Sequence, residues 1–538
     1  MTSARPAPVD RPDRAGDDGA EAYLAARVLD ALLREDYGGL ASRVTREAHQ
    51  VRLALPGGRR VRLAPGGLFQ DFAVAPGEAP ALAEVLGALA ELAGPRDAAG
   101  VAAFTEECRA ALRAERLHRA HRAAVAARLR TAPALIAYES LAAFLDHPVY
   151  PTSRARPGLT DRQLVAHAPE FAPAFPLRWA AVPAGRVVAH GRTPEWWPAA
   201  AGDGDPLFPV HPLTVDAVRA IPGVRILPEP HLTVRPTLSM RTVAVDGRTH
   251  LKLPLATSTL GARNRRSIRP GTLDDGALAE VLLDRVLARE PDLPVLVADE
   301  RTYAHAGDEH LAWMVRRLPP GDIVPVAALL APAPGPPGAR VLDQVAARHR
   351  GGDARALLAE YLKLLFGWNV RLFVRYGIAL EAHQQNLALV FGPDGAPAMR
   401  LLVKDNDGLL ISPGRLLGAG LPVPAFTDRR LFTADPHALA DVFVTITLHL
   451  AAAAVAFGAG HGDLVAPALA GALAGYGDHP MARLLRARTL EAARLVGKSM
   501  VTAGTLADRS LIAADVNKHY GTSGPNYLRR PPAGRTGP

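Results

Sequence analysis

The stretch that decides the fold is Ser239-Met-Arg-Thr-Val-Ala-Val-Asp-Gly-Arg-Thr-His-Leu-Lys252. Polar and apolar residues alternate on both sides of Asp246-Gly247, and an Asp-Gly pair favours a two-residue turn, so the stretch predicts a β-hairpin. With these two residues at the centre of the turn, Arg241 lies opposite Lys252. Opposed like charges destabilise a strand pair by about 0.2–1 kcal/mol, and a bound polyanion would reverse that effect. The hairpin is therefore a candidate phosphate site.

Hydroxyl and guanidinium groups near the hairpin extend this candidate site. Ser239 and Thr242 lie beside Arg241, and the run 257–266 (TSTLGARNRR) supplies further donors to anionic oxygens. The residues also leave a second interpretation open, in which Arg241 and Lys252 only extend their stems along a solvated sheet face.

Two polar clusters flank a second predicted hairpin. The first is Glu381–Asn386 (EAHQQN) and the second is Lys404–Gly408 (KDNDG). The hairpin brings Asn386 and Asp405 to the same open end, and their oxygens are ligands that Mg²⁺ takes together with substrate phosphates. His383 would bind a carboxylate or transfer a proton. The alternative interpretation is a polar turn whose side chains only cap backbone groups.

A third cluster is Asp146–Gly158 (DHPVYPTSRARPG). Its prolines favour an extended path, and Thr152, Ser153 and two arginines offer donors to phosphate or carboxylate. A further His-Pro pair begins at His211. Taken alone, both segments are only proline-rich turns.

Length and composition are those of a large globular protein. The 538 residues predict two or three packed subdomains. The net charge of +9 comes almost wholly from dispersed arginines, and no helix-turn-helix, RNP or zinc-finger spacing is present, so nucleic-acid binding is not predicted. The one cysteine, Cys108, permits no internal disulfide and suits the cytoplasm. The apolar stretch Val442–Gly458 contains Thr445, Thr447 and His449, which favours a buried helix over a membrane span.

The predicted elements form a mixed α+β pattern with helical ends. Apolar spacing predicts helices over residues 80–95, 105–130, 275–290, 354–376 and most of the chain after 431. Thr272 and Asp275 have the spacing of a capping box. The clearest linker is Leu329–Gly338 (LLAPAPGPPG). The second hairpin runs over Asn386–Asp405, with its turn at Gly392–Gly395.

In this order the segments resemble the aerobactin-synthetase (IucA/IucC) family of NRPS-independent siderophore (NIS) synthetases. Members show His-Pro-x-His-Pro-x-x-Lys-x-Arg-x-Gly, Pro-x-His-Pro, Ser-x-Arg-Thr, a Lys strand leading to Thr and Arg, Glu-x-His-x-Gln-Asn and Arg-Asp-x-x-Gly. The resemblance runs from about Tyr138 to Gly408 and continues faintly through a helical region that contains Lys498 and Arg509.

Three positions depart from the family pattern. Tyr150 stands where the family has its second His, Arg154 where it has Lys, and Lys404 where it has Arg. Arg154 and Lys404 keep the positive charge, whereas Tyr150 changes the chemistry of its position.

The resemblance implies an α+β, cupped-hand architecture around one ATP-binding cleft. Its parts are a mobile tail (1–20, without a signal peptide), a helical N-terminal thumb (21–145), an antiparallel-sheet, ATP-binding fingers part (146–330) and a mixed, largely helical palm (340–538).

The resemblance also implies roles for individual residues. Those assigned to ATP are His147, Thr152, Ser153, Arg154, Ser239, Arg241, Thr242, Lys252, Gln385, Asn386 and Asp405. Those assigned to the carboxylate substrate are Thr259, Arg263 and His383. Those assigned to Mg²⁺ are Glu381, Asn386 and Asp405, and the implied catalytic residues are Lys252, Arg263 and His383.

The implied activity is that of an AMP-forming acid–amine ligase in siderophore biosynthesis and iron acquisition. It adenylates a carboxylate (citrate, a citrate half-product or a related acid) and condenses it with an amine or alcohol. ATP and Mg²⁺ are the implied cofactors, the partners are these small molecules without nucleic acid or membrane, and a homodimer in the cytoplasm agrees with the family. Two other functions stay open. One is a kinase-like small-molecule phosphotransferase, because His461-Gly-Asp463 resembles a catalytic-loop fragment, and the other is a non-catalytic siderophore- or anion-binding protein.

Overall fold

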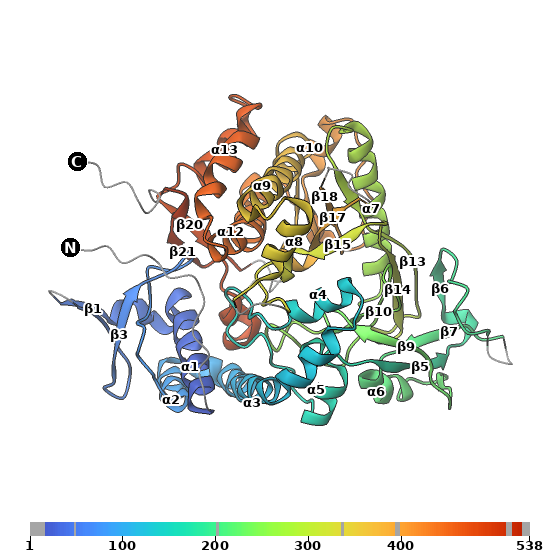
Figure 1. Cartoon of the computed structure of the whole chain (residues 1–538), viewed down its shortest axis with the longest axis horizontal. Helices are drawn as coiled ribbons and strands as arrows, with labels where there is room; N and C mark the ends of the chain where they lie inside the picture. Colours follow the sequence, from blue (N-terminus) through green and yellow to red (C-terminus); the bar gives the residue numbers. More distant parts are fainter. Residues whose placement is uncertain are drawn as a thin grey trace.

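The computed structural model describes residues 17–47, 50–200, 204–334, 338–392, 399–512 and 519–529. The N-terminal part lies at the lower left of Figure 1, the large sheet at the right, and the C-terminal helices at the top. Of the predicted tail, residues 1–16 lie outside the described residues, and Asp17–Ala20 form the start of the first helix.

The N-terminal part combines helices with a small sheet. Its elements are α1 (Asp17–Arg34), β1 (Val44–Glu47), β2 (Gln50–Ala54), β3 (Arg60–Pro65), β4 (Phe72–Val74), α2 (Leu82–Leu92), α3 (Ala98–Leu129) and α4 (Ala134–Ala142). The helices predicted over 80–95 and 105–130 are confirmed as α2 and α3. The sheet β1-β2-β3-β4 is an addition to the predicted helical thumb. Gly57 and Gly58, with φ of 82° and 86°, form the turn between β2 and β3.

The central sheet has nine strands, and every pair in it is antiparallel, as predicted. Its strands are β5 (Phe175–Ala181), β6 (Val188–His190), β7 (Leu207–Val210), β8 (Arg225–Ile226), β9 (His231–Pro236), β10 (Thr242–Ala244), β11 (Thr249–Lys252), β13 (Asp299–His305) and β14 (Ala312–Arg317). The helices within this part are α5 (Asp161–His167), α6 (Val215–Arg219) and α7 (Thr272–Arg289).

The predicted hairpin around Asp246-Gly247 is confirmed as β10–β11, but its predicted register is wrong by one residue. Thr242, and not Arg241, lies opposite Lys252. The Asp246 carboxylate accepts hydrogen bonds from Arg248 N and Thr249 N, both at 2.7 Å. This local bonding widens the loop beyond two residues, because Asp side chains stabilise turns of their own.

The start of α7 also differs from the expectation. The predicted capping box of Thr272 and Asp275 is wrong, because the helix is preceded by Gly271 in a left-handed conformation and has no side-chain cap. The Asp275 carboxylate accepts hydrogen bonds from Thr427 N (2.7 Å) and Asp428 N (2.9 Å) instead. The Asp275 carboxylate, which its spacing predicted to cap the helix, thus binds the backbone of a distant loop.

The C-terminal part contains a sheet in the order β12-β18-β17-β15, in which only the β12–β18 pair is parallel. Its strands are β12 (Val295–Val297), β15 (Asp322–Pro325), β17 (Leu387–Phe391) and β18 (Arg400–Val403), and β16 (Ile378–Leu380) pairs with β19 (Leu409–Ile411). The helices are α8 (Val341–His349), α9 (Ala354–Arg371), α10 (Pro413–Gly418), α11 (Pro436–Val442), α12 (Ala454–Gly458), α13 (Val465–Ala474) and α14 (Pro480–Arg488). A last hairpin joins β20 (Arg494–Gly497) to β21 (Thr522–Pro525).

The helix and the hairpin predicted in this part are confirmed, whereas the predicted linker begins inside the core. The helix over 354–376 is α9, continued by a π-helical turn and ended by Gly377 with φ of 65°. The hairpin Asn386–Asp405 is β17–β18; of its predicted turn Gly392–Gly395, residues 393–395 lie outside the described residues. In the predicted linker 329–338, Leu329 and Ala331 are buried in the main core, and residues 335–337 lie outside the described residues.

Within the described residues, one helical run, Pro436–Gly458, is long and apolar enough to cross a membrane. In this structure 83% of its most apolar window is buried inside the molecule. Val442–Gly458 is therefore the buried helix that was predicted, and it passes through the main hydrophobic core.

The segment after β20 returns to the N-terminal part. The Glu35 carboxylate, at the end of α1, accepts hydrogen bonds from Val501 N (3.0 Å) and Thr502 N (2.8 Å). Asp97 Oδ1, before α3, accepts one from Asp508 N at 2.8 Å. The turn formed by Thr502–Leu506 packs against α3, so the two ends of the chain enclose the space between the three parts.

Candidate active site

A cleft of about 1120 Å³ lies between the three parts of the molecule. Thirteen of the fifteen predicted site residues line it, from segments far apart in sequence. These residues are His147, Ser153, Arg154, Ser239, Arg241, Lys252, Thr259, Arg263, Glu381, His383, Gln385, Asn386 and Asp405. The other two, Thr152 and Thr242, are buried beside the cleft and do not line it.

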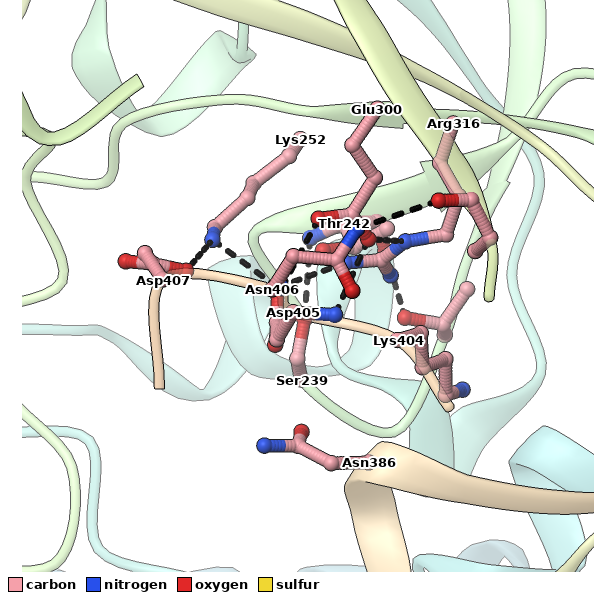
Figure 2. Close-up of polar contacts among 12 residues, drawn as sticks. Ser239, Thr242, Lys252, Glu300, Arg316, Asn386, Lys404, Asp405, Asn406 and Asp407 are labelled. Atoms are coloured by element: carbon pink, nitrogen blue, oxygen red, sulfur yellow. Dashed lines mark hydrogen bonds and ion pairs between the residues drawn. The ribbon is translucent and has the colours of Figure 1, made fainter. Parts of the chain in front are cut away.

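The centre of the cleft is a network of buried charges (Figure 2). Lys252 Nζ lies 2.8 Å from Asp405 Oδ1 and 3.4 Å from Asp407 Oδ1. The guanidinium of Arg316 on β14 lies 2.5 Å from the same Asp405 oxygen and 2.5 Å from Glu300 Oε1. The side chains of Lys252 and Arg316 are only 4% and 3% exposed, so both cations depend on these partners.

Glu300 on β13 also holds the backbone at Asp405. Its carboxylate accepts hydrogen bonds from Asp405 N (2.9 Å) and Asn406 N (3.1 Å). Asp405 adopts a φ of 61°, a conformation that non-glycine residues adopt at a cost and that surrounding contacts must hold. Burial would raise the pKa of Asp405, but Lys252 and Arg316 outweigh burial and hold that pKa well below its usual range. Asp405 is therefore an ionised, fixed acceptor.

The loop from Arg241 to Arg266 supplies crowded cations. Arg241 Nη1 donates to Ser267 O at 3.0 Å, and Arg266 lies close enough that burial and the charge of Arg241 together lower the pKa of Arg266 to about 9. The polyanion argument made for Arg241 and Lys252 applies to this pair instead, since a bound anion relieves repulsion between adjacent guanidinium groups.

His147 and His383 face the cleft as neutral rings. His147 Nδ1 accepts hydrogen bonds from Val149 N (3.3 Å) and Tyr150 N (3.1 Å), and His383 Nδ1 accepts one from Gln385 N (3.3 Å). Burial and then nearby charges lower the pKa of His147 to about 3. Burial lowers the pKa of His383 to about 4, against the opposing effect of Asp405. A neutral ring that accepts at Nδ1 carries its proton on Nε2. Both rings can therefore donate to an anionic oxygen.

Arg263 connects the cleft to the returning C-terminal segment. Its guanidinium donates to Ala503 O (2.9 Å) and Ala507 O (2.6 Å), and its backbone N donates to Gly504 O (3.1 Å). Burial and the neighbouring charge of Arg509 lower the pKa of Arg263. Arg263 and Arg509 both line the cleft, so they provide a second cationic region.

Tyr150 points away from the cleft. Its hydroxyl donates to Glu107 Oε1 at 2.8 Å, in a fully buried position within the N-terminal core. The departure from the family's second His therefore concerns the packing of the His147 loop rather than a group that faces a substrate.

Several residues of the site were not assigned from the sequence. Arg316, Glu300, Arg266 and Asp407 are the principal ones. Arg266 lay in a recognised donor run but received no role. One feature of the sequence could have revealed Arg316. An arginine on the buried face of a strand needs an oppositely charged partner, which indicates a buried ion pair.

The oxygen donors suit Mg²⁺ held together with substrate phosphates. Lys252 and Arg316 both bind Oδ1 of Asp405, so Oδ2 is the atom that could take a metal. Asn386 Nδ2 donates to Glu381 O at 3.1 Å, which leaves its side-chain oxygen as the acceptor. No group of three His, Cys, Asp or Glu side chains among the described residues could hold a metal alone. This donor set fits Mg²⁺, which often takes only one or two carboxylates and completes its shell with phosphate and water.

Comparison with known proteins shows which family the chain resembles. Residues 134–331 match the model described as "IucA / IucC family". The predicted resemblance to this family is thereby confirmed over these residues. Residues 355–498 match a second model, described as "Ferric iron reductase FhuF-like transporter".

The chain has relatives among siderophore biosynthesis proteins. It is 28% identical over 323 residues to the rhizobactin siderophore biosynthesis protein RhbC of Rhizobium meliloti (strain 1021), covering 49% of this chain and 52% of that protein. The chain spans about half the length of the curated relatives it matches.

Solved structures share the fold of this chain over nearly all of its length. The petrobactin biosynthesis protein AsbB from Bacillus anthracis str. Sterne has a TM-score of 0.73 and 15% identity, covering 95% of this chain and 96% of that one. ATP-bound aerobactin synthetase IucA from Klebsiella pneumoniae has a TM-score of 0.69 and 18% identity, covering 94% and 99%. The predicted NIS synthetase fold is thereby confirmed.

Proposed function

We propose that this protein is an AMP-forming siderophore synthetase that joins a carboxylic acid to an amine or alcohol. The observation that carries the proposal is the buried Lys252–Asp405–Arg316 network, set beside Asn386 in a cleft lined by further cations. Such a cleft suits two anions that repel each other and must be brought into contact. The family match and the ATP-bound relative support the same activity.

The proposed reaction has two steps. A carboxylate oxygen of the acid attacks the α-phosphorus of ATP, and pyrophosphate leaves with the electron pair of the broken P–O bond. An amine then attacks the acyl carbon, AMP leaves, and the amine loses a proton to give the amide; an alcohol gives an ester. We assign the phosphates to Lys252, Arg241 and Ser239, and the acid to Arg263, Thr259 and the Nε2–H of His383.

Mg²⁺ would be held by Asp405 and Asn386, with Glu381 nearby, and it would neutralise charge on the phosphates. The protein's own contribution is to fix positions. Asp405 holds Lys252 in position through a contact of 2.8 Å. Arg316 balances the other negative charge of the network, which is that of Glu300. Because these groups are bonded before substrate arrives, little reorganisation is needed during the reaction.

The alternative functions have less support from the structure. Asp463, from the fragment that resembled a kinase catalytic loop, pairs with Arg355 at 2.6 Å and does not line the cleft.

The test measures AMP and pyrophosphate release from Mg-ATP, with hydroxylamine as a small nucleophile and a panel of acids that includes citrate and succinate. Wild type is expected to release AMP only in the presence of a particular acid. Lys252→Ala should lower that rate by at least about a hundredfold, as removal of a transition-state charge partner commonly does. Lys363→Ala, a change at an exposed lysine of α9 outside the cleft, is the matched control and should keep the wild-type rate.

Release of ADP in place of AMP would replace the proposal with a phosphotransferase. If the protein binds ATP or an acid but turns over neither, and if Asp405→Ala binds as wild type does, the protein is a binding protein.

A further inference from the structure

One buried carboxylate, Glu107 on α3, is bonded to two separate segments that form the cleft. Its Oε1 accepts hydrogen bonds from Tyr150 (2.8 Å) and from the Thr152 hydroxyl (2.6 Å). Its Oε2 accepts a hydrogen bond from the Thr505 hydroxyl at 3.0 Å. Glu107 is 2% exposed, and it does not itself line the cleft.

The first segment carries His147. Tyr150 donates its hydroxyl to Glu107 and its backbone N to His147 Nδ1, so one residue connects the buried carboxylate with the ring. The Ser153 hydroxyl accepts a hydrogen bond from His147 N at 3.2 Å, which closes the loop on its other side. The position of this loop therefore fixes both the place and the tautomer of the His147 ring.

The second segment carries Arg263. The Thr505 hydroxyl that donates to Glu107 also accepts a hydrogen bond from Ala262 N at 3.0 Å. The neighbouring backbones are in close contact, since a Cβ added at Gly261 would lie 3.0 Å from the Gly504 Cα. Because Arg263 donates to three carbonyl oxygens of the same C-terminal turn, a shift of Thr505 shifts Arg263 as well.

The bonds at Glu107 are directional and come from hydroxyl groups. Tyr150, Thr152 and Thr505 are all buried, and among the described residues these hydroxyls are its side-chain partners. A hydroxyl must point at its acceptor to bond, whereas an ion pair tolerates a range of positions. The contacts are thus suited to setting positions rather than to attracting charge.

We propose that Glu107 is a positioning residue with two arms: through Tyr150 and Thr152 it sets His147, and through Thr505 it sets Arg263. The proposal rests on the proposed function, in which Arg263 serves the acid, and on the ATP-binding role that the family resemblance implies for His147. It follows that changes in the two arms act on different substrates.

The experiment measures the KM for ATP, the KM for the acid and kcat separately, by acid-dependent AMP release. Tyr150→Phe should raise the KM for ATP and leave that for the acid nearly unchanged, whereas Thr505→Val should do the reverse. The loss of one hydrogen bond predicts changes of about three- to tenfold. Glu107→Gln should raise both values, and Thr505→Ser, which keeps the hydroxyl, should restore the KM for the acid.

The matched control is Thr489→Val. Thr489 is as buried as Thr505, but its hydroxyl donates to Leu485 O, and neither residue lines the cleft. This variant should lose some thermal stability and keep both KM values. If Tyr150→Phe and Thr505→Val behave as Thr489→Val does, or if each raises both KM values equally, the proposal is overturned.

Failure of the proposed function would be seen separately, as a wild type that makes no AMP with any acid. The dissociation constant of Mg-ATP, measured by calorimetry for wild type and Tyr150→Phe, then tests the His147 arm without turnover. Weaker binding by Tyr150→Phe would support the arm, and equal binding would overturn it.

Discussion

At the scale of single residues, the cleft depends on how its buried charges are paired. Arg316 and Arg317 are neighbours on β14 that differ in this respect. Arg316 is buried between Glu300 and Asp405, whereas Arg317 is 43% exposed and contacts Asp299 at 3.4 Å. The same substitution at the two positions therefore compares how much a buried charge network and a surface ion pair contribute to stability.

Arg316→Met should lower the free energy of unfolding by about 3–5 kcal/mol, because it leaves the buried Glu300 carboxylate without its cation and leaves Asp405 with Lys252 alone. Arg317→Met, the control, should change it by less than about 1 kcal/mol, as is usual for exposed pairs. Urea denaturation of the two variants measures the difference. Equal effects would show that the Arg316 network does not stabilise the fold.

The neutral histidines lead to a prediction for pH dependence. The pKa values of His147 and His383, about 3 and about 4, place both rings in the neutral form throughout the range from pH 6 to pH 8. The rate of acid-dependent exchange of pyrophosphate into ATP, which reports the first step alone, should therefore show no inflection near pH 6.5. An inflection there that disappears in His383→Gln would contradict the donor role given to this ring.

The sequence predicted the residues of the site better than it predicted their support. Asn386 and Asp405 lie in polar clusters that interrupt apolar segments, and Lys252 lies on a strand of a predicted hairpin, so local patterns reveal all three. Arg316 and Glu300 lie in ordinary-looking strands, and Arg316 meets Asp405 across 89 residues of chain. Pairing over that distance depends on the sheet order, which single-sequence patterns do not give.

At the scale of elements, the prediction was accurate where the causes are local. The helices α2, α3 and α9 follow from their apolar spacing, and both hairpins pair the strands that were predicted. Errors arose where a side chain made an unforeseen bond. The carboxylate of Asp246 enlarged a turn, and that of Asp275 bonded a loop some 150 residues away.

The docking of the C-terminal turn on α3 depends on one glycine. A Cβ added at Gly100 would lie 1.9 Å from Leu506 O, a distance that requires the backbone to move. Gly100→Ala should therefore destabilise the protein by about 1–3 kcal/mol through overpacking. It should also weaken binding of the acid, because Arg263 is bonded to the same turn.

Gly87→Ala on α2 is the control for this change. No atom lies within 4 Å of a Cβ added there, so this variant should gain about 0.5–1 kcal/mol from helix propensity alone. Thermal melting of both variants tests the prediction, and two variants of similar stability would contradict it.

At the scale of the whole molecule, buried histidines couple stability to pH. His118 and His449 are 5% and 7% exposed, and burial is the main reason that their pKa values fall to about 3 and about 4. The unfolded chain binds protons at these rings near pH 6.5, but the folded protein does not. Acidification below pH 6.5 therefore favours the unfolded state, by about 1.4 kcal/mol per pH unit for each ring until its folded pKa is reached.

Urea denaturation between about pH 7 and about pH 5 measures this dependence. His118→Gln should reduce the slope, whereas His437→Gln, at an exposed position on α11, should leave it unchanged. A slope that is the same in all three proteins would show that His118 is not responsible.

The return of the C-terminal segment to the N-terminal part also constrains synthesis in the cell. Glu35, Asp97 and Glu107 are made early, yet their partners lie at residues 501–508, about 400 residues later. Contacts of such long sequence separation form late in folding. A nascent chain thus exposes an incomplete cleft until residues 501–508 have left the ribosome, and a ligand of the cleft cannot help the earlier parts to fold by binding to a finished site.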